Sequence, residues 1–248
     1  MLIYGVNPVV EALRAGRASV VRLSDGARGR HRDIRELARA RGVPVQDVSV
    51  ADLDRSSRGG VHQGVAAELV NQPSWSVAEL VAGAPHAPLL VVLDGIEDPH
   101  NVGAILRTAD AAGVDGVIRQ SRHAARLDGA AAKVSAGAIA HVRIAEVVNI
   151  ARAVEALKDA GVWTIGLDAE GADPYDAIDL TLPTAFVLGA EGSGLRRLVR
   201  ERCDRLVAIP MRGHVSSLNV SAAAAVVLFE AVRQRRQQPL LIPHPSKL

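Results

Sequence analysis

The feature that most constrains the fold is a regular alternation of short apolar runs and helical stretches from Leu89 onward. Leu89–Leu93 is a continuous apolar run of the kind that is buried on both faces of a parallel sheet. The strands predicted after it are 116–118, 162–167, 185–188 and 206–209, and the predicted helices are 101–112, 149–160, 194–203 and 219–235. This alternation is typical of an α/β fold with a mostly parallel sheet covered on both faces.

The first 70 or so residues predict a smaller α/β unit that is separate from this sheet. Its first helix is expected to be capped by Asn7, with Pro8 at the first helical position. Residues 1–72 contain 11 arginines, no lysine and eight acidic residues, a net charge of +3. Arg32, Arg35 and Arg39 fall on one side of a second predicted helix, which is either a solvated face or a surface that binds nucleic-acid phosphates.

We therefore divide the chain into four segments. They are a front domain at 1–72, a linker at 73–88 that is rich in proline, a second domain at 89–238 and a tail at 239–248.

Composition excludes several classes of protein. Only 2% of the residues are aromatic, which argues against single-strand binders that stack bases on Phe, Tyr and Trp. Cys203 is the one cysteine and the eight histidines lack zinc-binding spacing, so neither a disulfide nor a metal site is expected. The amino terminus lacks a signal-peptide pattern and no apolar run reaches about 20 residues, so we expect a cytoplasmic protein without membrane spans.

Three loops rich in glycine and small polar residues follow predicted strands, at 94–103, 189–194 and 210–219. In an open parallel sheet, ligands bind at the carboxyl ends of the strands. Each loop also has a structural explanation: Asn101, Ser217 and Asn219 would be helix N-caps, Arg107 a solvated helix residue, and the glycines turn residues. Their joint occurrence after three strands favours a ligand site. The loops contain neither a P-loop nor the Gly-x-Gly-x-x-Gly fingerprint, which excludes P-loop nucleotidases and makes a dinucleotide-dependent oxidoreductase remote.

The three loops resemble, in order and separation, the three signature motifs of the SPOUT-class RNA 2′-O-ribose methyltransferases. The matching segments are 101–109 (NVGAILRTA), 188–195 (LGAEGSGL) and 209–221, which begins IPM and ends SSLNVS. Residues 1–70 are also similar to the substrate-binding domain of one bacterial branch, which methylates a guanosine ribose in large-subunit ribosomal RNA. Tyr4–Val9 and His62–Gly64 carry this second similarity.

The resemblance implies a fold, a cofactor and partners. The fold is an α/β SPOUT domain whose carboxyl end forms a deep trefoil knot, preceded by the small RNA-binding domain. The methyl donor is S-adenosyl-L-methionine, the substrate is RNA, and the enzyme is a homodimer to which the apolar helix 219–235 contributes. By motif position, Gly189, Ile209 and Leu218 bind the cofactor, mostly through backbone groups.

The resemblance also implies five catalytic residues, which are Asn101, Arg107, Glu191, Ser217 and Asn219. Arg107 is the central residue, acting either as a general base or as a cation that binds a substrate phosphate and stabilises the developing alkoxide. We prefer the second role because arginine scarcely deprotonates in proteins. Asn101 is expected to orient Arg107 or the ribose, and Glu191 to anchor Arg107 in a bidentate pair. Ser217 and Asn219 are expected to hydrogen-bond the substrate or the motif loops.

Three alternatives stay open beside a guanosine methyltransferase of 23S ribosomal RNA. The first is a transfer-RNA ribose methyltransferase, and the second is a self-protection enzyme of an antibiotic producer that methylates another ribosomal nucleotide. The third, from another class, is a non-catalytic RNA-binding or ribosome-assembly protein, against which the intact motif residues argue.

Overall fold

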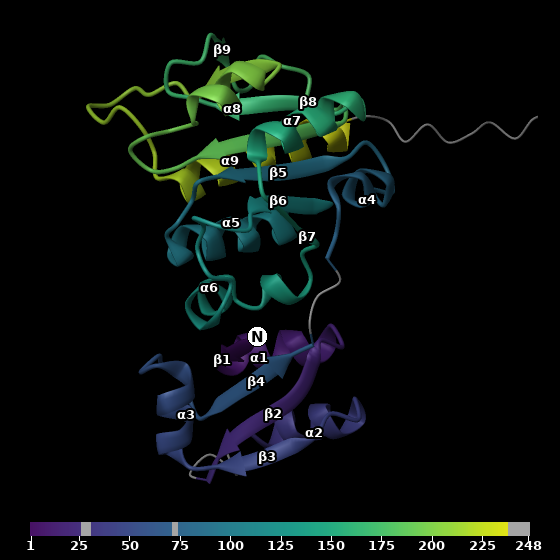
Figure 1. Ribbon diagram of the computed structural model, residues 1–248, viewed down its shortest axis with the longest axis vertical. Helices are drawn as coiled ribbons and strands as arrows, with labels where there is room; N and C mark the ends of the chain where they lie inside the picture. The colour runs from purple at the N-terminus through teal and green to yellow at the C-terminus, as the bar shows by residue number, and fades with distance from the viewer. Residues whose placement is uncertain (26–30, 71–73, 238–248) are drawn as a thin grey trace, which may run out of the picture.

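The computed structural model describes residues 1–25, 31–70 and 74–237. The predicted tail at 239–248 lies outside the described residues. Two separate sheets divide the described chain into an N-terminal lobe, residues 1–70, and a C-terminal lobe, residues 74–237 (Figure 1).

The N-terminal lobe contains a four-stranded sheet of order β1-β4-β2-β3, in which only the β2–β3 pair is parallel. Its strands are β1 (Leu2–Tyr4), β2 (Ala18–Ser24), β3 (Val45–Val48) and β4 (Val65–Leu69). Its helices are α1 (Val6–Arg14), α2 (Arg32–Ala40) and α3 (Val50–Ser57). The lobe is therefore a small α/β unit, as the sequence predicts.

The prediction that Asn7 caps the first helix is wrong. The helix α1 begins at Val6, and its N-cap is Gly5, which has a φ of 98° that a residue with a side chain rarely adopts. The side chain of Gln63 accepts a hydrogen bond of 3.0 Å from the Val6 N–H, so one of the first amides of the helix is satisfied without an Asn cap.

The C-terminal lobe contains a seven-stranded sheet of order β7-β6-β5-β10-β8-β11-β9, and each neighbouring pair in it is parallel. Its strands are β5 (Leu89–Asp94), β6 (Gly116–Gln120), β7 (Ile144–Val147), β8 (Trp163–Leu167), β9 (Asp173–Pro174), β10 (Thr184–Gly189) and β11 (Arg205–Ala208). Every residue of β5 and β10 is buried, so the predicted central strand and the predicted parallel sheet are confirmed.

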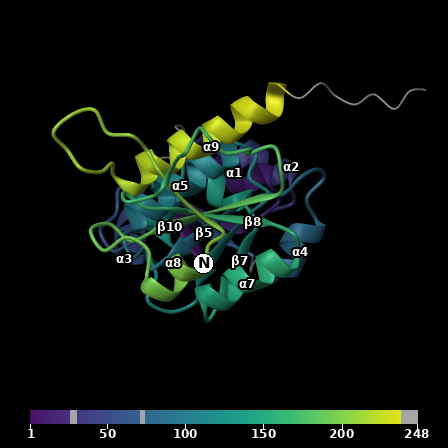
Figure 2. The ribbon, with the colours of Figure 1, turned by 90° about the horizontal axis from the view of Figure 1, so that it is seen from above.

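Helices cover both faces of this sheet (Figure 2). One face is covered by α5 (Pro99–Ala111) and α9 (Val220–Gln237), and the other by α4 (Val77–Ala82), α7 (Ile150–Asp159) and α8 (Arg197–Arg202). The helix α4 lies within the stretch expected to be a linker, and its Leu80 is fully buried in the core. Among the described residues, no helix is long and apolar enough to cross a membrane.

Three predicted helices differ in detail from the observed ones. The helix α5 begins at Pro99 because Asp98 is its N-cap, with a hydrogen bond of 2.9 Å from the His100 N–H to Asp98 Oδ1. The helix α8 is shorter than predicted because residues 194–196 close the preceding loop instead. The final helix, α9, ends at Gln237, two residues beyond the predicted end; it buries one face only, and Phe229 on another face is 48% exposed.

The two lobes meet where the helix α6 (Gly129–Val134) and the short 3-10 helix η2 (Ala138–Ala140) face β1 and α1 (Figure 1). Because α6 and η2 also pack against α5, this helix lies close to the N-terminal lobe.

Candidate active site

The loops that follow β5 and β10 leave the same edge of the sheet side by side. Asp94 and Gly189 are the last residues of these two parallel strands and are paired in register. Asp94 is fully buried, and its carboxylate accepts hydrogen bonds from the Arg196 backbone N–H (2.8 Å) and from Arg196 Nε (2.7 Å), with a further ion pair to Nη2. The first loop therefore holds the far end of the second loop in place.

Close backbone packing explains why glycines occur in this second loop. A Cβ on Gly189 would overlap the backbone of Gly194. Two backbone hydrogen bonds between Ala190 and Gly194, of 3.1 and 2.9 Å, close the turn, and Gly194 has a φ of 65°. The turn needs a glycine at both ends.

Asn101 connects all three predicted loops. It is 6% exposed, its Nδ2 donates to Glu191 Oε2 (3.1 Å), and its Oδ1 accepts from Asn219 Nδ2 (2.9 Å). Asn219 in turn accepts from the Ser221 N–H (2.9 Å) and so caps α9. Asn101 is not a helix cap, whereas Asn219 combines a cap with a place in the site.

Arg107 lies apart from these residues. It follows Asn101 by six positions on α5, which separates the two side chains by about 120° around the helix and about 9 Å along it. Among the described residues, the exposed Arg107 guanidinium has no hydrogen-bond or ion-pair partner. The expected bidentate pair between Glu191 and Arg107 is wrong within one chain, because Glu191 binds Asn101. Ser217 is also exposed, and within the described part of the chain no hydrogen bond joins it to the other four residues.

The third loop offers backbone groups to a ligand. In the described part of the chain, the backbone N–H and C=O groups of residues 209–218 make no hydrogen bond with one another or with other residues. Ile209 is half-buried against the core and Leu218 is 39% exposed, so both can flank a ligand with apolar surface. This combination fits S-adenosylmethionine, whose adenosyl group is polar at its edge and apolar on its faces.

Neither metal binding nor a cysteine nucleophile is indicated by the described residues. No three His, Cys, Asp or Glu side chains among them are arranged to hold a metal ion. Burial raises the pKa of the Cys203 thiol to about 12, and the nearby Asp204 carboxylate acts in the same direction. At neutral pH the side chain is therefore a thiol, which is a poor nucleophile.

Sequence reasoning did not single out Asp94 and Arg196 as site residues. The one available signal was a carboxylate at the end of a wholly apolar run, because a buried carboxylate requires a partner. The identity of that partner, 102 residues further along the chain, was not available from the sequence.

Comparison with known proteins gives consistent matches along the chain. Residues 88–229 match the model of the SpoU rRNA Methylase family, and residues 2–75 match the model for RNA 2′-O ribose methyltransferase substrate binding. The chain is 44% identical to the 23S rRNA (guanosine-2′-O-)-methyltransferase RlmB of Pseudomonas aeruginosa, over 94% of this chain and 96% of that protein. It is also 44% identical to an uncharacterized tRNA/rRNA methyltransferase of Mycolicibacterium gilvum, over 95% of this chain and 77% of that protein.

A solved structure agrees with these matches. The SpoU methyltransferase AviRb from Streptomyces viridochromogenes, in complex with the cofactor AdoMet, superimposes with a TM-score of 0.81 at 31% identity, covering 96% of this chain and 91% of that chain. The fold and the site thus define an RNA methyltransferase that uses S-adenosylmethionine as methyl donor. The chain belongs to the SpoU rRNA methylase family.

Proposed function

We propose that this enzyme methylates the ribose 2′-hydroxyl of a guanosine in 23S ribosomal RNA. The observation that carries the proposal is the hydrogen-bonded chain Glu191–Asn101–Asn219, which joins the three motif loops at the carboxyl edge of the sheet. Similarity to RlmB over nearly the whole chain, including the N-terminal lobe, supports the substrate. We assign residues 1–72 to RNA binding, 73–88 to the connection between the domains, whose helix α4 packs on the larger sheet, and 89–238 to catalysis. We also place the enzyme in the cytoplasm.

The residues of this chain divide the work of the reaction. When bound, S-adenosylmethionine supplies an electrophilic methyl group, held by backbone groups near Gly189, Ile209 and Leu218. Asn101 and its two partners fix the loops so that the ribose hydroxyl lies in line with that group. Arg107 binds the phosphate next to the ribose and stabilises the alkoxide that develops as the hydroxyl loses its proton to solvent water. Ser217, which is exposed, is free to hydrogen-bond the substrate.

Arg107 implies that two chains form each site. It lies on a different face of α5 from Asn101, so one chain does not bring the two side chains together. We propose a homodimer in which each subunit has the family's carboxyl-terminal knot. In this dimer, Arg107 of one subunit completes the site formed by the three loops of the other. The half-exposed Phe229, beside a hollow of about 350 Å³ on α9, supports a partner contact there.

Subunit mixing tests the composite site. Chains with Arg107→Ala and chains with Asn101→Ala are each expected to be inactive, but random mixed dimers carry one intact site in every heterodimer. Recovery of about a quarter of the wild-type activity supports shared sites. No recovery in mixtures that mass spectrometry shows to contain heterodimers would mean that each chain builds its own site.

The substrate is tested by methyl transfer from labelled S-adenosylmethionine to three unmodified RNAs: 23S ribosomal RNA, its fragments and a transfer-RNA pool. Mapping the ribose methyl to a guanosine of 23S RNA supports the proposal. Incorporation into transfer RNA alone, or into a ribosomal nucleotide other than guanosine, would replace it with one of the two related enzymes. Absence of transfer to every RNA, with RNA binding retained, would favour a non-catalytic assembly protein.

A further inference from the structure

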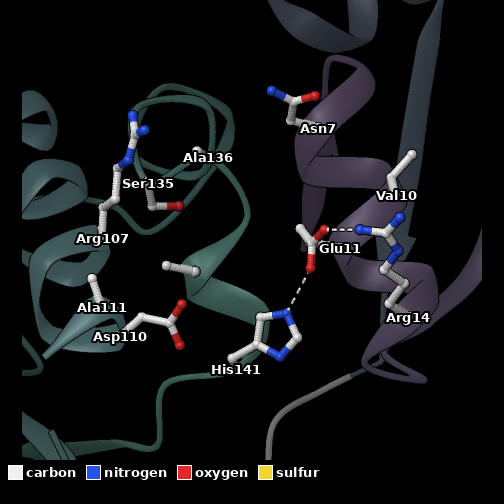
Figure 3. Close-up of a pocket in the computed structure, with 11 residues that line it drawn as sticks. Asn7, Val10, Glu11, Arg14, Arg107, Asp110, Ala111, Ser135, Ala136 and His141 are labelled. Atoms are coloured by element: carbon white, nitrogen blue, oxygen red, sulfur yellow. Dashed lines mark hydrogen bonds and ion pairs between the residues drawn. The ribbon is translucent and has the colours of Figure 1, made fainter. Parts of the chain in front are cut away.

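A cleft of about 500 Å³ separates the two lobes (Figure 3). The helix α1 forms one wall. The other wall is formed by the carboxyl-terminal half of α5 and by residues 135–141. The volume lies within the range of about 300–1,000 Å³ that is usual for sites of small ligands, so the cleft has room for part of a polynucleotide strand.

The cleft is a built feature because the lobes meet through specific packing. The Tyr4 ring lies against Gly129, where a Cβ would overlap it. Gly137 has a φ of 98°, and a Cβ on it would lie 2.5 Å from the Cβ of Glu11. Lys133 Nζ also donates to the Val61 carbonyl (3.3 Å). Two glycines of the C-terminal lobe, Gly129 and Gly137, therefore fix the distance between the walls.

Arginines stand on both walls. Arg107 comes from α5 and is without a partner among the described residues, while Arg14 comes from the last turn of α1 and is 62% exposed (Figure 3). Arg14 Nη1 forms an ion pair of 2.8 Å with Glu11 Oε1, and Glu11 Oε2 lies 3.1 Å from His141 Nε2. An exposed pair of this kind contributes little to stability, so Arg14 is readily released to a better anion.

Carboxylates in the cleft limit which part of it can hold an anion. Asp110 and Glu11 are the acidic side chains that line it. Figure 3 shows Asp110 directed toward the His141 end and the Arg107 guanidinium directed away from it, toward the end where Asn7 lies. The end between Arg107 and Asn7 thus has one guanidinium and one side-chain amide as donors. The other arginine, Arg14, is paired with Glu11, so an incoming anion has to displace the Glu11 carboxylate.

We propose that this cleft binds the RNA strand that flanks the reacting ribose, with one phosphodiester on Arg107, a neighbouring phosphodiester on Arg14 and Asn7 hydrogen-bonded to the strand. Guanidinium groups suit this task because they bind phosphate oxygens through two parallel hydrogen bonds. The scarcity of aromatic residues in the chain also favours recognition through the sugar-phosphate backbone over base stacking. The inference rests on the proposed function and adds Arg14, Asn7 and Glu11 to the substrate site.

Binding of an unmodified 23S RNA fragment, measured by fluorescence anisotropy over a range of salt concentrations, tests the cleft. We expect Arg14→Ala to weaken the Kd about tenfold and to make the slope of log K against log salt shallower by about 0.7, the value for one phosphate contact on a single strand. Arg197→Ala is the matched control, because Arg197 is an exposed helical arginine with its own ion pair of 2.9 Å, to Glu201, and lies on α8, which covers the face of the sheet opposite to α5. Its RNA affinity is expected to stay unchanged.

Glu11→Gln separates the two roles that Glu11 can have. If Glu11 competes with phosphate for Arg14, the neutral variant binds RNA more tightly than the wild type. If Glu11 acts only through its contact with His141, which joins the lobes, the variant binds RNA more weakly, which would overturn the inference.

Equal RNA affinity of Arg14→Ala and wild type would also overturn the inference. Neither result touches the proposed function, which depends on methyl transfer by the wild-type enzyme. Because affinity is measured without turnover, a failure of methyl transfer likewise leaves the cleft testable. S-adenosylmethionine affinity is expected to be the same in all these variants.

Discussion

The ion pair between Asp94 and Arg196 gives the sharpest test of what holds the loop after β10, from Gly189 to Arg196, in place. Asp94 is fully buried, and Arg196 supplies both side-chain donors to its carboxylate, together with one backbone N–H. Replacing Arg196 by Met keeps the backbone donor and removes the two charged ones. The buried carboxylate then keeps one hydrogen bond, from the backbone, and most of the free-energy cost of removing its charge from water is no longer compensated.

The expected loss of stability depends on which partner is removed, because Asp94 is fully buried whereas Arg196 is half exposed. Breaking a buried pair by removing one partner costs about 3–5 kcal/mol, and we take about 3 kcal/mol because the Arg196 side chain is 51% exposed. Asp94→Asn leaves a half-exposed arginine that water can solvate, so about 2 kcal/mol is expected for it. At roughly 2–4 °C per kcal/mol for a chain of this size, Arg196→Met lowers the Tm by about 6–12 °C and Asp94→Asn by about 4–8 °C.

Calorimetric unfolding of the two single variants and the double variant measures the coupling. The double variant is expected to be about 1–3 kcal/mol more stable than the sum of the single effects predicts, because neither charge is then left without its partner. The same proteins, titrated with S-adenosylmethionine, are expected to bind it about tenfold more weakly, since the loop from Gly189 to Arg196 is held less firmly. Additive effects on the Tm, or unchanged affinity for the cofactor in both single variants, would refute the reasoning.

Three further predictions follow from individual side chains. Arg107→Ala is expected to lower single-turnover methyl transfer at least about 100-fold and to leave S-adenosylmethionine affinity unchanged, and near wild-type transfer would remove Arg107 from the reaction. Cys203, with its pKa raised to about 12 against an ordinary 9.0, is expected to alkylate slowly at pH 8 until the chain is denatured, and its contribution to stability is present below pH 9 and is lost progressively as the pH rises from 9 toward 12. Arg235 donates to four backbone carbonyls, those of Ala87 and Pro88 just before β5 and those of Leu180 and Leu182 just before β10. Arg235→Met is therefore expected to cost about 2–4 kcal/mol in denaturant unfolding, whereas Arg236→Met, at the exposed neighbouring position, should cost less than about 0.5 kcal/mol.

Much of the fold was available from local patterns. The wholly apolar stretch that forms β5 predicted a central parallel strand, and β10 followed the same rule. The caps were less predictable, because Asp98 and Gly5 took the places assigned to Asn101 and Asn7. A first amide of α5 is satisfied by the adjacent Asp98, and one of α1 by Gln63, which is 57 residues away, and a preference scale for single residues registers neither.

The site was only partly predictable. Five residues were expected to form one catalytic site, and the structure brings three of them, Asn101, Glu191 and Asn219, into contact. The pair between Glu191 and Arg107 was not formed, because six residues of helix turn Arg107 to a different face of α5. That phase difference is visible in the sequence, but which face meets the loops depends on how α5 packs on the sheet.

The sequence alone determined the approximate positions of the main strands and the candidate turn glycines, since both follow from the periodicity of side chains and from the backbone angles that a residue permits. Tertiary structure decided which distant groups meet: Asp94 with Arg196, Asn101 with two other loops, and Glu11 with His141 across the lobes. Such contacts depend on the order of strands in the sheet and on the packing of one lobe against the other. Strand order and lobe packing are both set by the free energy of the whole folded chain, and no short segment encodes either of them.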